Sequence, residues 1–197
     1  MPKIGILAIQ GDVKEHTLVL GEMGVEVVEV RLPDQLEDLD GLIIPGGEST
    51  TIIQLIDLYG LRTPLTSKIK LGLPVWGTCA GMIVLAGSLT DERPDPLHLM
   101  DIEVSRNAFG AQVDSFETFI VVKHIGEPKI RAVFIRAPIV TKVGKDVEIL
   151  AKLENDIPVC VKDRNMLATA FHPELTQDTR IHEFFVDLVN KSINSRV

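Results

Sequence analysis

The sequence predicts an α/β fold: a mostly parallel central sheet with helices on both faces, and additional antiparallel strands in the second half. The first observation behind this prediction is a regular alternation of short apolar segments with helical patterns over residues 1–90, which is typical of a parallel sheet. The second is a change from about residue 100, where β-branched runs separated by turn residues indicate hairpins or a mixed sheet. No linker, repeat or low-complexity segment interrupts the 197 residues, so we expect a single domain over residues 1–197.

Each expected element has its own local signal. Apolar runs in the first half predict strands at residues 4–9, 25–30, 40–44 and 73–76. The expected helices of that half cover residues 13–23 (with Gly24 as the stop), a segment from the cap at 49–51 through Tyr59, one more before residue 73, and one that begins at Met82. Later strands are expected at 119–122, 132–135, 147–150, 159–161 and 166–171, and a last helix at 179–193.

Composition and charge exclude several classes of function. A formal net charge of −8, with scattered lysine and arginine, argues against binding nucleic acid or an anionic membrane through a general basic surface. No apolar run approaches a membrane span, and no basic segment precedes the first strand, so we expect no signal peptide. The two cysteines make no disulfide framework, and a functional thiol needs a reducing compartment, so we expect the cytoplasm.

Residues 77–81, Gly-Thr-Cys-Ala-Gly, join an expected strand to an expected helix and suggest a cysteine nucleophile. In such an elbow a sharp turn between small residues lifts one side chain above the sheet. The start of the helix favours a thiolate at Cys79, and the following amide, of Ala80, is placed to stabilise an oxyanion. The alternative is a buried structural thiol, which is also the interpretation for Cys160 within its strand pattern.

A cysteine nucleophile needs a base, and His172 is the best candidate among five histidines. Pro173 keeps His172 out of helical geometry. In an extended segment residues two apart point to the same side, so Glu174 is placed to orient the imidazole. A surface histidine beside a solvated glutamate is the alternative, but the presence of the cysteine elbow favours the functional interpretation.

Two glycines follow the expected strand at 40–44, in the stretch Pro45-Gly46-Gly47. They permit an unusual peptide orientation and a close approach of the backbone to a ligand. A second oxyanion donor, the amide of Gly47, is the functional interpretation. A phosphate cradle is a weaker alternative, because no glycine-rich phosphate-binding pattern follows, and a plain turn between strand and helix is a third.

Three motifs in this order resemble the class I (triad) glutamine amidotransferases, which have a flavodoxin-like, doubly wound fold: the Gly-Gly pair, the cysteine elbow and His-Pro-Glu near the carboxyl end. Further stretches are similar to one branch of that family, the glutaminase subunits of pyridoxal 5′-phosphate synthases. They are Ile9-Gln10-Gly11 with Glu15-His16, residues 45–50, Arg106-Asn107 with Phe109-Gly110, residues 115–117 and residues 134–138. One departure is Ala111, where the branch has arginine; it bears on a local contact or a partner preference, not on the triad.

The resemblance implies hydrolysis of L-glutamine to L-glutamate and ammonia through a cysteine thioester, with no cofactor and no metal. Cys79 would attack the amide, His172 would shuttle protons and Glu174 would orient His172. The amides of Gly47 and Ala80 would form the oxyanion hole. The glutamine pocket would contain Gly47, Glu48, Ser49, Arg106, Ile135 and Arg136. Of the two arginines, we prefer Arg106 as the bidentate partner of the substrate α-carboxylate.

The resemblance also implies a partner, a β/α-barrel synthase subunit that receives the ammonia within a large hetero-oligomer and builds pyridoxal phosphate from a pentose phosphate and a triose phosphate. The glutaminase would be largely latent until docked. The candidate docking face carries Gln10, Gly11, Glu15 and His16, and a flip of the Gly46–Gly47 peptide is the candidate switch.

Three other functions stay open from the sequence. The chain could be the glutaminase of another synthase, such as one forming imidazole glycerol phosphate or anthranilate. It could instead be a cysteine hydrolase or a stress protein on the same scaffold, although the His-Pro-Glu spacing fits those classes poorly. The third alternative is a catalytically silent regulatory module.

Overall fold

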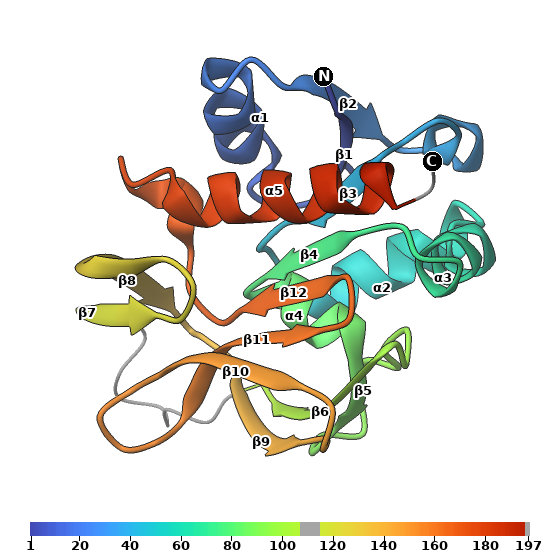
Figure 1. Ribbon diagram of the computed structural model, residues 1–197. Coiled ribbons are helices and arrows are strands. Elements are labelled where there is room, and N and C mark those ends of the chain that lie inside the picture. The colour runs from blue at the N-terminus through green and yellow to red at the C-terminus, as the bar shows by residue number, and fades with distance from the viewer. Residues whose placement is uncertain (107–114, 196–197) are drawn as a thin grey trace.

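A computed structural model describes residues 1–106 and 115–195 (Figure 1). Its central sheet contains β1 (Lys3–Leu7), β2 (Glu26–Val30), β3 (Gly41–Ile44), β4 (Val75–Thr78), β10 (Glu148–Lys152), β11 (Pro158–Asp163) and β12 (Met166–Thr169). The strand order is β10-β11-β12-β4-β3-β1-β2. The strands from β12 to β2 pair in parallel, whereas β11 and β10 continue the sheet in antiparallel. The parallel part has the flavodoxin-like strand order, which confirms the predicted fold class.

Helices cover both faces of this sheet. They are α1 (Val13–Glu22), α2 (Ser49–Leu58), α3 (Arg62–Lys70), α4 (Ala80–Leu85) and α5 (Arg180–Asn194), together with the short 3₁₀ helices η1 (Pro33–Leu36) and η2 (Pro173–Leu175). In Figure 1 the red helix α5 crosses the near face of the sheet, where Phe185 and Val189 pack against Gly41 of β3. Helices α2 and α4 pack together behind the sheet.

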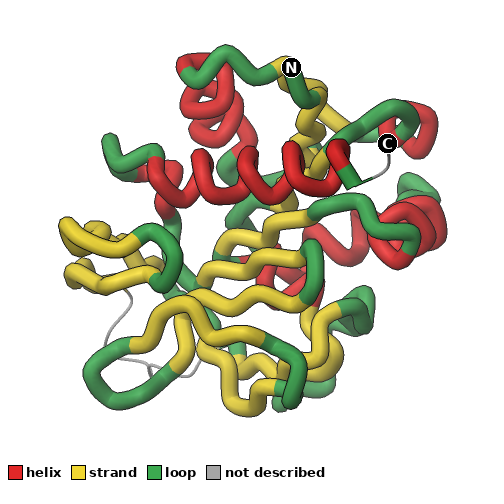
Figure 2. Tube along the Cα trace, in the orientation of Figure 1, coloured by secondary structure: helices red, strands yellow, loops and turns green. Residues whose placement is uncertain are grey.

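The second half adds two smaller sheets to this core. One contains β5 (Ala86–Leu89), β6 (Met100–Ser105) and β9 (Ile139–Val143), and the other is the hairpin of β7 (Ser115–Val122) and β8 (Gly126–Ile135). Figure 2 shows these strands in the lower part of the molecule and most of the helices in the upper part. The hairpin contacts the core directly, because the His172 amide donates to the carbonyl of Val133 at 2.9 Å.

Two local predictions are wrong in detail. The helix expected from Met82 begins at Ala80 and ends at Leu85, after which the chain pairs as strand β5. Every residue from Val75 to Ala86 is buried, so polarity carries no period that would separate helix from strand there. The cap of α2 is Glu48, whose side chain accepts from the Thr50 amide at 3.3 Å, and residues 49–51 lie inside the helix.

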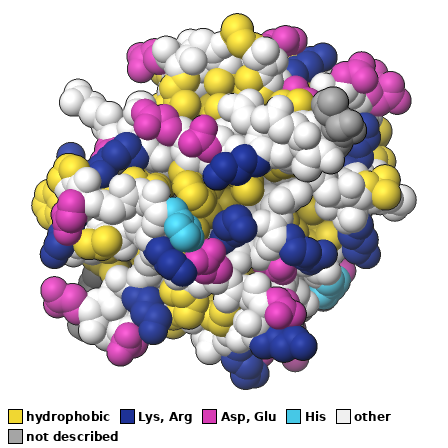
Figure 3. Space-filling view, in the orientation of Figure 1, with side chains coloured by type: hydrophobic (Ala, Val, Ile, Leu, Met, Phe, Trp, Pro, Cys, Tyr) yellow, Lys and Arg dark blue, Asp and Glu magenta, His cyan; other side chains and the backbone are white. Residues whose placement is uncertain are grey.

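Charged side chains on the surface are scattered, as the sequence predicts. On the face shown in Figure 3, acidic side chains are interspersed with lysine and arginine. Within the described ranges, no helix combines the length and the apolar content needed to cross a membrane.

Candidate active site

The candidate site lies at the carboxyl end of the parallel sheet, where ligands bind in doubly wound folds. Four strands end there, and the loops after them are far apart in sequence but close in space. The loops supply Asp12 after β1, Gly47 after β3, Cys79 after β4 and His172 after β12.

The elbow predicted at Cys79 is present. Cys79 connects β4 directly to α4 with φ of 47° and ψ of −102°, a strained conformation for a residue other than glycine. Its amide donates to the carbonyl of Thr169 at 2.8 Å, which holds the strained residue in place. Gly81 is sterically required, because a Cβ atom there would lie 2.0 Å from the carbonyl oxygen of Ile44.

His172 and Glu174 meet as predicted, but through a different backbone geometry. Nδ1 of His172 donates to Oε1 of Glu174 at 2.7 Å, and both residues are buried. The segment is not extended: Pro173 begins the 3₁₀ helix η2 immediately after His172. The fixed φ of proline suits the first position of a helical turn, and this turn folds the carboxylate back onto the ring.

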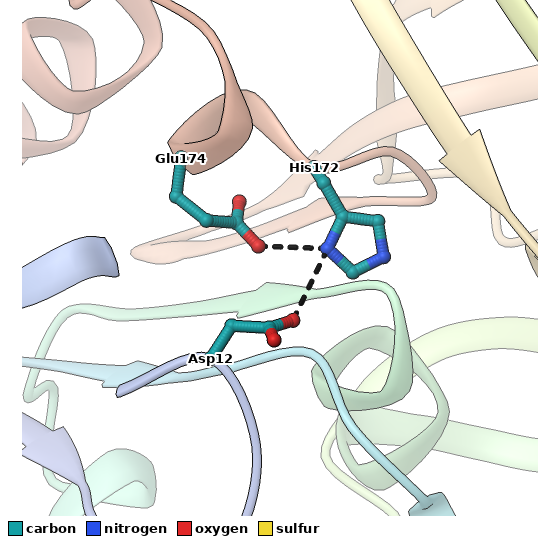
Figure 4. A group of neighbouring side chains, drawn as sticks. All are labelled: Asp12, His172 and Glu174. Atoms are coloured by element: carbon teal, nitrogen blue, oxygen red, sulfur yellow. Dashed lines mark hydrogen bonds and ion pairs between the residues drawn. The ribbon is translucent and has the colours of Figure 1, made fainter. Parts of the chain in front are cut away.

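Asp12 is a further residue of the site that the sequence analysis missed. Its Oδ2 lies 3.4 Å from Nδ1 of His172, the same nitrogen that binds Glu174 (Figure 4). Its amide donates to the carbonyl of Gly46 at 3.0 Å, which connects the loop after β1 to the glycine turn after β3. The sequence held one signal for this role: Asp12 follows the expected first strand by a few residues, and the carboxyl end of that strand faces the site.

The surroundings of His172 favour its charged form. Burial lowers the pKa of the imidazole, but hydrogen bonds with Asp12, Cys79 and Glu174 outweigh burial and raise that pKa well above its ordinary value. Burial also raises the pKa of the Glu174 carboxyl, against the opposing effect of its bond with His172. We place the shared proton on His172, because Asp12 stabilises only the imidazolium.

The same three side chains form a group with the ligand types of a metal site. Ligand atoms of Asp12, His172 and Glu174 all lie within 4.8 Å of one another. Nδ1 of His172 is already bonded to Glu174, so a metal ion on that nitrogen would have to displace this bond. The arrangement is therefore explained as an imidazolium between two carboxylates.

A cavity of about 350 Å³ opens in front of these residues. It is lined by Cys79, Ala80 and His172 and by every residue that the resemblance assigned to a glutamine pocket, namely Gly47, Glu48, Ser49, Arg106, Ile135 and Arg136. The Cys79 sulfur lies 3.8 Å from the carbonyl oxygen of Ile135, at the wall of this cavity. The size suits a small polar ligand.

Both arginines line the cavity, and the guanidinium of Arg106 is held there by two hydrogen bonds. Its Nη2 donates to Oε1 of Glu48 at 3.2 Å and its Nη1 to the carbonyl of Arg93 at 2.8 Å. Its Nε is buried and has no hydrogen-bond partner among the described residues.

The predicted docking residues separate into two groups. Gln10 lies at the cavity and accepts from the Glu48 amide at 2.8 Å, Gly11 is exposed and Glu15 is partly exposed. His16 is fully buried, so its assignment to a docking face is wrong in this structure. The expectation missed this because His16 lies on the inner side of α1, against α5 and β4. Asn107, Phe109, Gly110 and Ala111 lie outside the described residues.

The site can carry out acyl transfer to a cysteine. Such chemistry needs a cysteine at the wall of a cavity, a charged imidazole held by carboxylates and an adjacent pocket with an arginine, and the site has all three. A model of the SNO glutamine amidotransferase family matches residues 6–191. The chain belongs to this family.

Relatives of this amidotransferase match its sequence over nearly the whole length. A protein of Dehalococcoides mccartyi named pyridoxal 5′-phosphate synthase subunit PdxT is 53% identical over 188 residues, which cover 94% of this chain and 96% of that protein. A protein of Frankia alni with the same name is 52% identical, covering 99% and 98% of the two chains. A solved structure described as a glutamine amidotransferase superimposes with a TM-score of 0.90 at 45% identity, covering 95% of this chain and 98% of that one.

Proposed function

We propose that this amidotransferase is the glutaminase subunit of a pyridoxal 5′-phosphate synthase and that it hydrolyses L-glutamine to L-glutamate and ammonia. One observation carries the proposal: Cys79, the His172–Glu174 pair and six predicted pocket residues converge at one cavity. They do so in a chain about half identical, end to end, to proteins named as that subunit.

The reaction begins when the sulfur of Cys79 attacks the side-chain carbonyl carbon of glutamine, forming a C–S bond and an oxyanion. The amides of Gly47 and Ala80 stabilise the oxyanion. His172 then donates its proton to the amide nitrogen, the C–N bond breaks and ammonia leaves. The neutral His172 takes a proton from the water that attacks the thioester. The C–S bond then breaks, glutamate leaves, and the Cys79 thiolate and the His172 imidazolium are restored. Glu174 holds the ring orientation throughout, and Arg106 binds the substrate α-carboxylate.

The released ammonia needs a partner protein that uses it. We propose that a β/α-barrel synthase subunit receives the ammonia within a large hetero-oligomer, and that the surface of Gln10, Gly11 and Glu15 contributes to docking. The free thiols of Cys79 and Cys160 are consistent with a cytoplasmic protein. We further propose that residues 1–197 act as one glutaminase domain.

The glycine turn connects docking with the oxyanion hole, because Gln10 belongs to the proposed docking surface and also contacts the turn. A flip of the Gly46–Gly47 peptide would complete or undo the hole. A Cβ atom on Gly47 would lie 2.5 Å from Oε1 of Gln10, and the φ of Gly47 is 156°. Gly47→Val should therefore reduce turnover far more than glutamine binding. Equal losses of turnover and of binding, measured by kinetics and calorimetry, would argue against the switch.

The function is tested by purifying the chain with a barrel-type synthase and supplying glutamine labelled with ¹⁵N in the side-chain amide. We expect glutamate release to rise on addition of the synthase, and the label to appear in pyridoxal phosphate. The Cys79→Ala complex should release no glutamate above background, yet should form pyridoxal phosphate from added ammonia. Glutamate release without transfer of the label would assign the chain to another synthase, and no release in the complex would support a silent module.

A further inference from the structure

A buried polar cluster lies behind the triad, on the side away from the cavity. Its members are His16 from α1, Thr78 from β4 and His182 from α5, all with 0% exposure. Trp76 packs edge-on against both histidine rings, at centroid distances of 5.4 and 4.8 Å. Three fully buried polar side chains in an apolar core are costly unless they bond to one another.

The cluster is connected to Glu174. Nδ1 of His16 lies 3.0 Å from Nε2 of His182, and Nε2 of His16 lies 3.2 Å from Oγ1 of Thr78. The same Nε2 is 3.7 Å from Oε2 of Glu174. Within the described part of the chain this oxygen has no hydrogen-bond partner, although Oε1 is bonded to His172. The nitrogen of His16 therefore faces the one unpaired oxygen of the triad carboxylate.

Both histidines are neutral at physiological pH. Burial, followed by the charges of His182 and His172, lowers the pKa of His16 well below its ordinary value. Burial lowers the pKa of His182 to about 4. A neutral imidazole carries one N–H group, so each ring has one donor and one acceptor nitrogen.

The carboxylate decides which nitrogen carries each proton. A carboxylate only accepts hydrogen bonds, so the N–H of His16 belongs on Nε2, where it points to Glu174 and Thr78. Nδ1 of His16 is then an acceptor, and Nε2 of His182 must donate to it. This leaves Nδ1 of His182 as a bare acceptor, which agrees with its lack of a partner among the described residues.

We propose that His16 is a positioning residue for the triad carboxylate: it holds an Nε2–H group toward Oε2 of Glu174 and is itself fixed by His182. Glu174 then keeps the orientation in which Oε1 binds His172. This inference rests on the proposed glutaminase function.

The test compares variants in the assembled complex with the synthase, using glutamate release. His16→Leu removes the Nε2–H group that faces Glu174 at 3.7 Å, and we expect kcat to fall roughly 10-fold, as for the loss of one weak polar contact to a charged group, with KM nearly unchanged. His16→Gln keeps an N–H donor of similar reach and should recover much of the loss. Phe185→Leu is the matched control, because Phe185 packs on Trp76 beside the cluster and forms no hydrogen bond with the cluster. This substitution should lower the stability of the protein but not kcat.

A spectroscopic measurement on the wild-type protein does not depend on whether a variant folds. Long-range ¹H–¹⁵N spectra of the wild-type imidazoles should show His16 as the neutral Nε2–H tautomer from pH 6 to 8. An Nδ1–H tautomer or an imidazolium at His16 would overturn the proposal.

The kinetic outcomes are equally decisive. The proposal fails if His16→Leu loses no more kcat than Phe185→Leu, or if His16→Gln is as impaired as His16→Leu while equally stable. An inactive wild-type complex would instead contradict the proposed function.

Discussion

At the scale of single residues, one ring nitrogen of His172 lies between two carboxylates. Glu174 is buried and bonded to that nitrogen at 2.7 Å, whereas Asp12 is partly exposed and 3.4 Å away. Glu174 fixes the orientation of the ring, and both carboxylates stabilise its positive charge. In the proposed mechanism the charge on His172 matters because the imidazolium donates the proton with which ammonia leaves.

Asp12→Asn should move the alkaline limb of the pH profile to lower pH. Removing the negative charge lowers the pKa of His172, so the imidazolium is lost earlier as the pH rises. The measurement is kcat/KM for glutamate release against pH, in the complex. Asp12→Glu retains the charge and is the control. An alkaline limb that does not move in Asp12→Asn would show that Asp12 does not act on His172.

Arg106→Lys should raise KM for glutamine roughly 10- to 100-fold with little change in kcat, because it removes a bidentate contact to a carboxylate that does not react. Arg136→Lys is the matched variant from the same cavity and should have a smaller effect. Steady-state kinetics distinguishes the two. A larger rise in KM for Arg136→Lys would show that Arg136, and not Arg106, binds the α-carboxylate of glutamine.

At the scale of elements, the strained turn between β4 and α4 is what presents Cys79. The turn depends on close contact between the first turn of α4 and the end of β3, where the carbonyl of Ile44 takes the space that a side chain at Gly81 would need. The position of the nucleophile is thus determined by backbone packing between two elements.

Gly81→Ala should therefore destabilise the fold by about 1–3 kcal/mol or more and displace Cys79, because the obstructing atom belongs to the backbone. Gly21→Ala is the matched control: it lies in α1, nothing lies within 4 Å of the added Cβ, and the change should stabilise by about 0.5–1 kcal/mol. Urea unfolding measures both. Equal stability of the two variants would contradict this view of the elbow.

Local signals in the sequence predicted the alternating elements, the cysteine elbow and the His172–Glu174 pair, because each depends on residues close together along the chain. The roles of Asp12 and His16 were missed, because each depends on contacts with residues far away in sequence. The turn at Pro173 was mistaken for an extended segment, because a proline restricts the residue before it without fixing the conformation of the residues after it.

At the scale of the whole molecule, the buried histidines make stability depend on pH. His16 and His182 join α1 and α5 through the core, and both have a lowered pKa in the folded state. The unfolded chain binds protons at these residues below about pH 6.5, while the folded chain does not. The stability that these neutral rings contribute is therefore complete above that pH and is lost as the pH falls below it, toward about 4 for His182.

His182→Gln should make stability less dependent on pH between 6 and 5, by up to about 1.4 kcal/mol per pH unit, the slope of one proton. Glu174 opposes this trend in both proteins, because its pKa is raised, so the difference between the two curves reports His182 together with its effect on the pKa of His16. Urea unfolding at several pH values supplies the measurement. Parallel curves for the two proteins would show that folding does not lower the pKa of His182.

The proposed mechanism depends on Cys79 as a nucleophile activated by His172, and covalent labelling in the assembled synthase tests this role most directly. A chloroketone analogue of glutamine should add to Cys79 alone, because Cys160 is fully buried and burial raises the pKa of its thiol. His172→Ala should slow that labelling by about 10²- to 10⁴-fold. No adduct on Cys79 in the presence of the synthase, or an equal rate in His172→Ala, would contradict the mechanism.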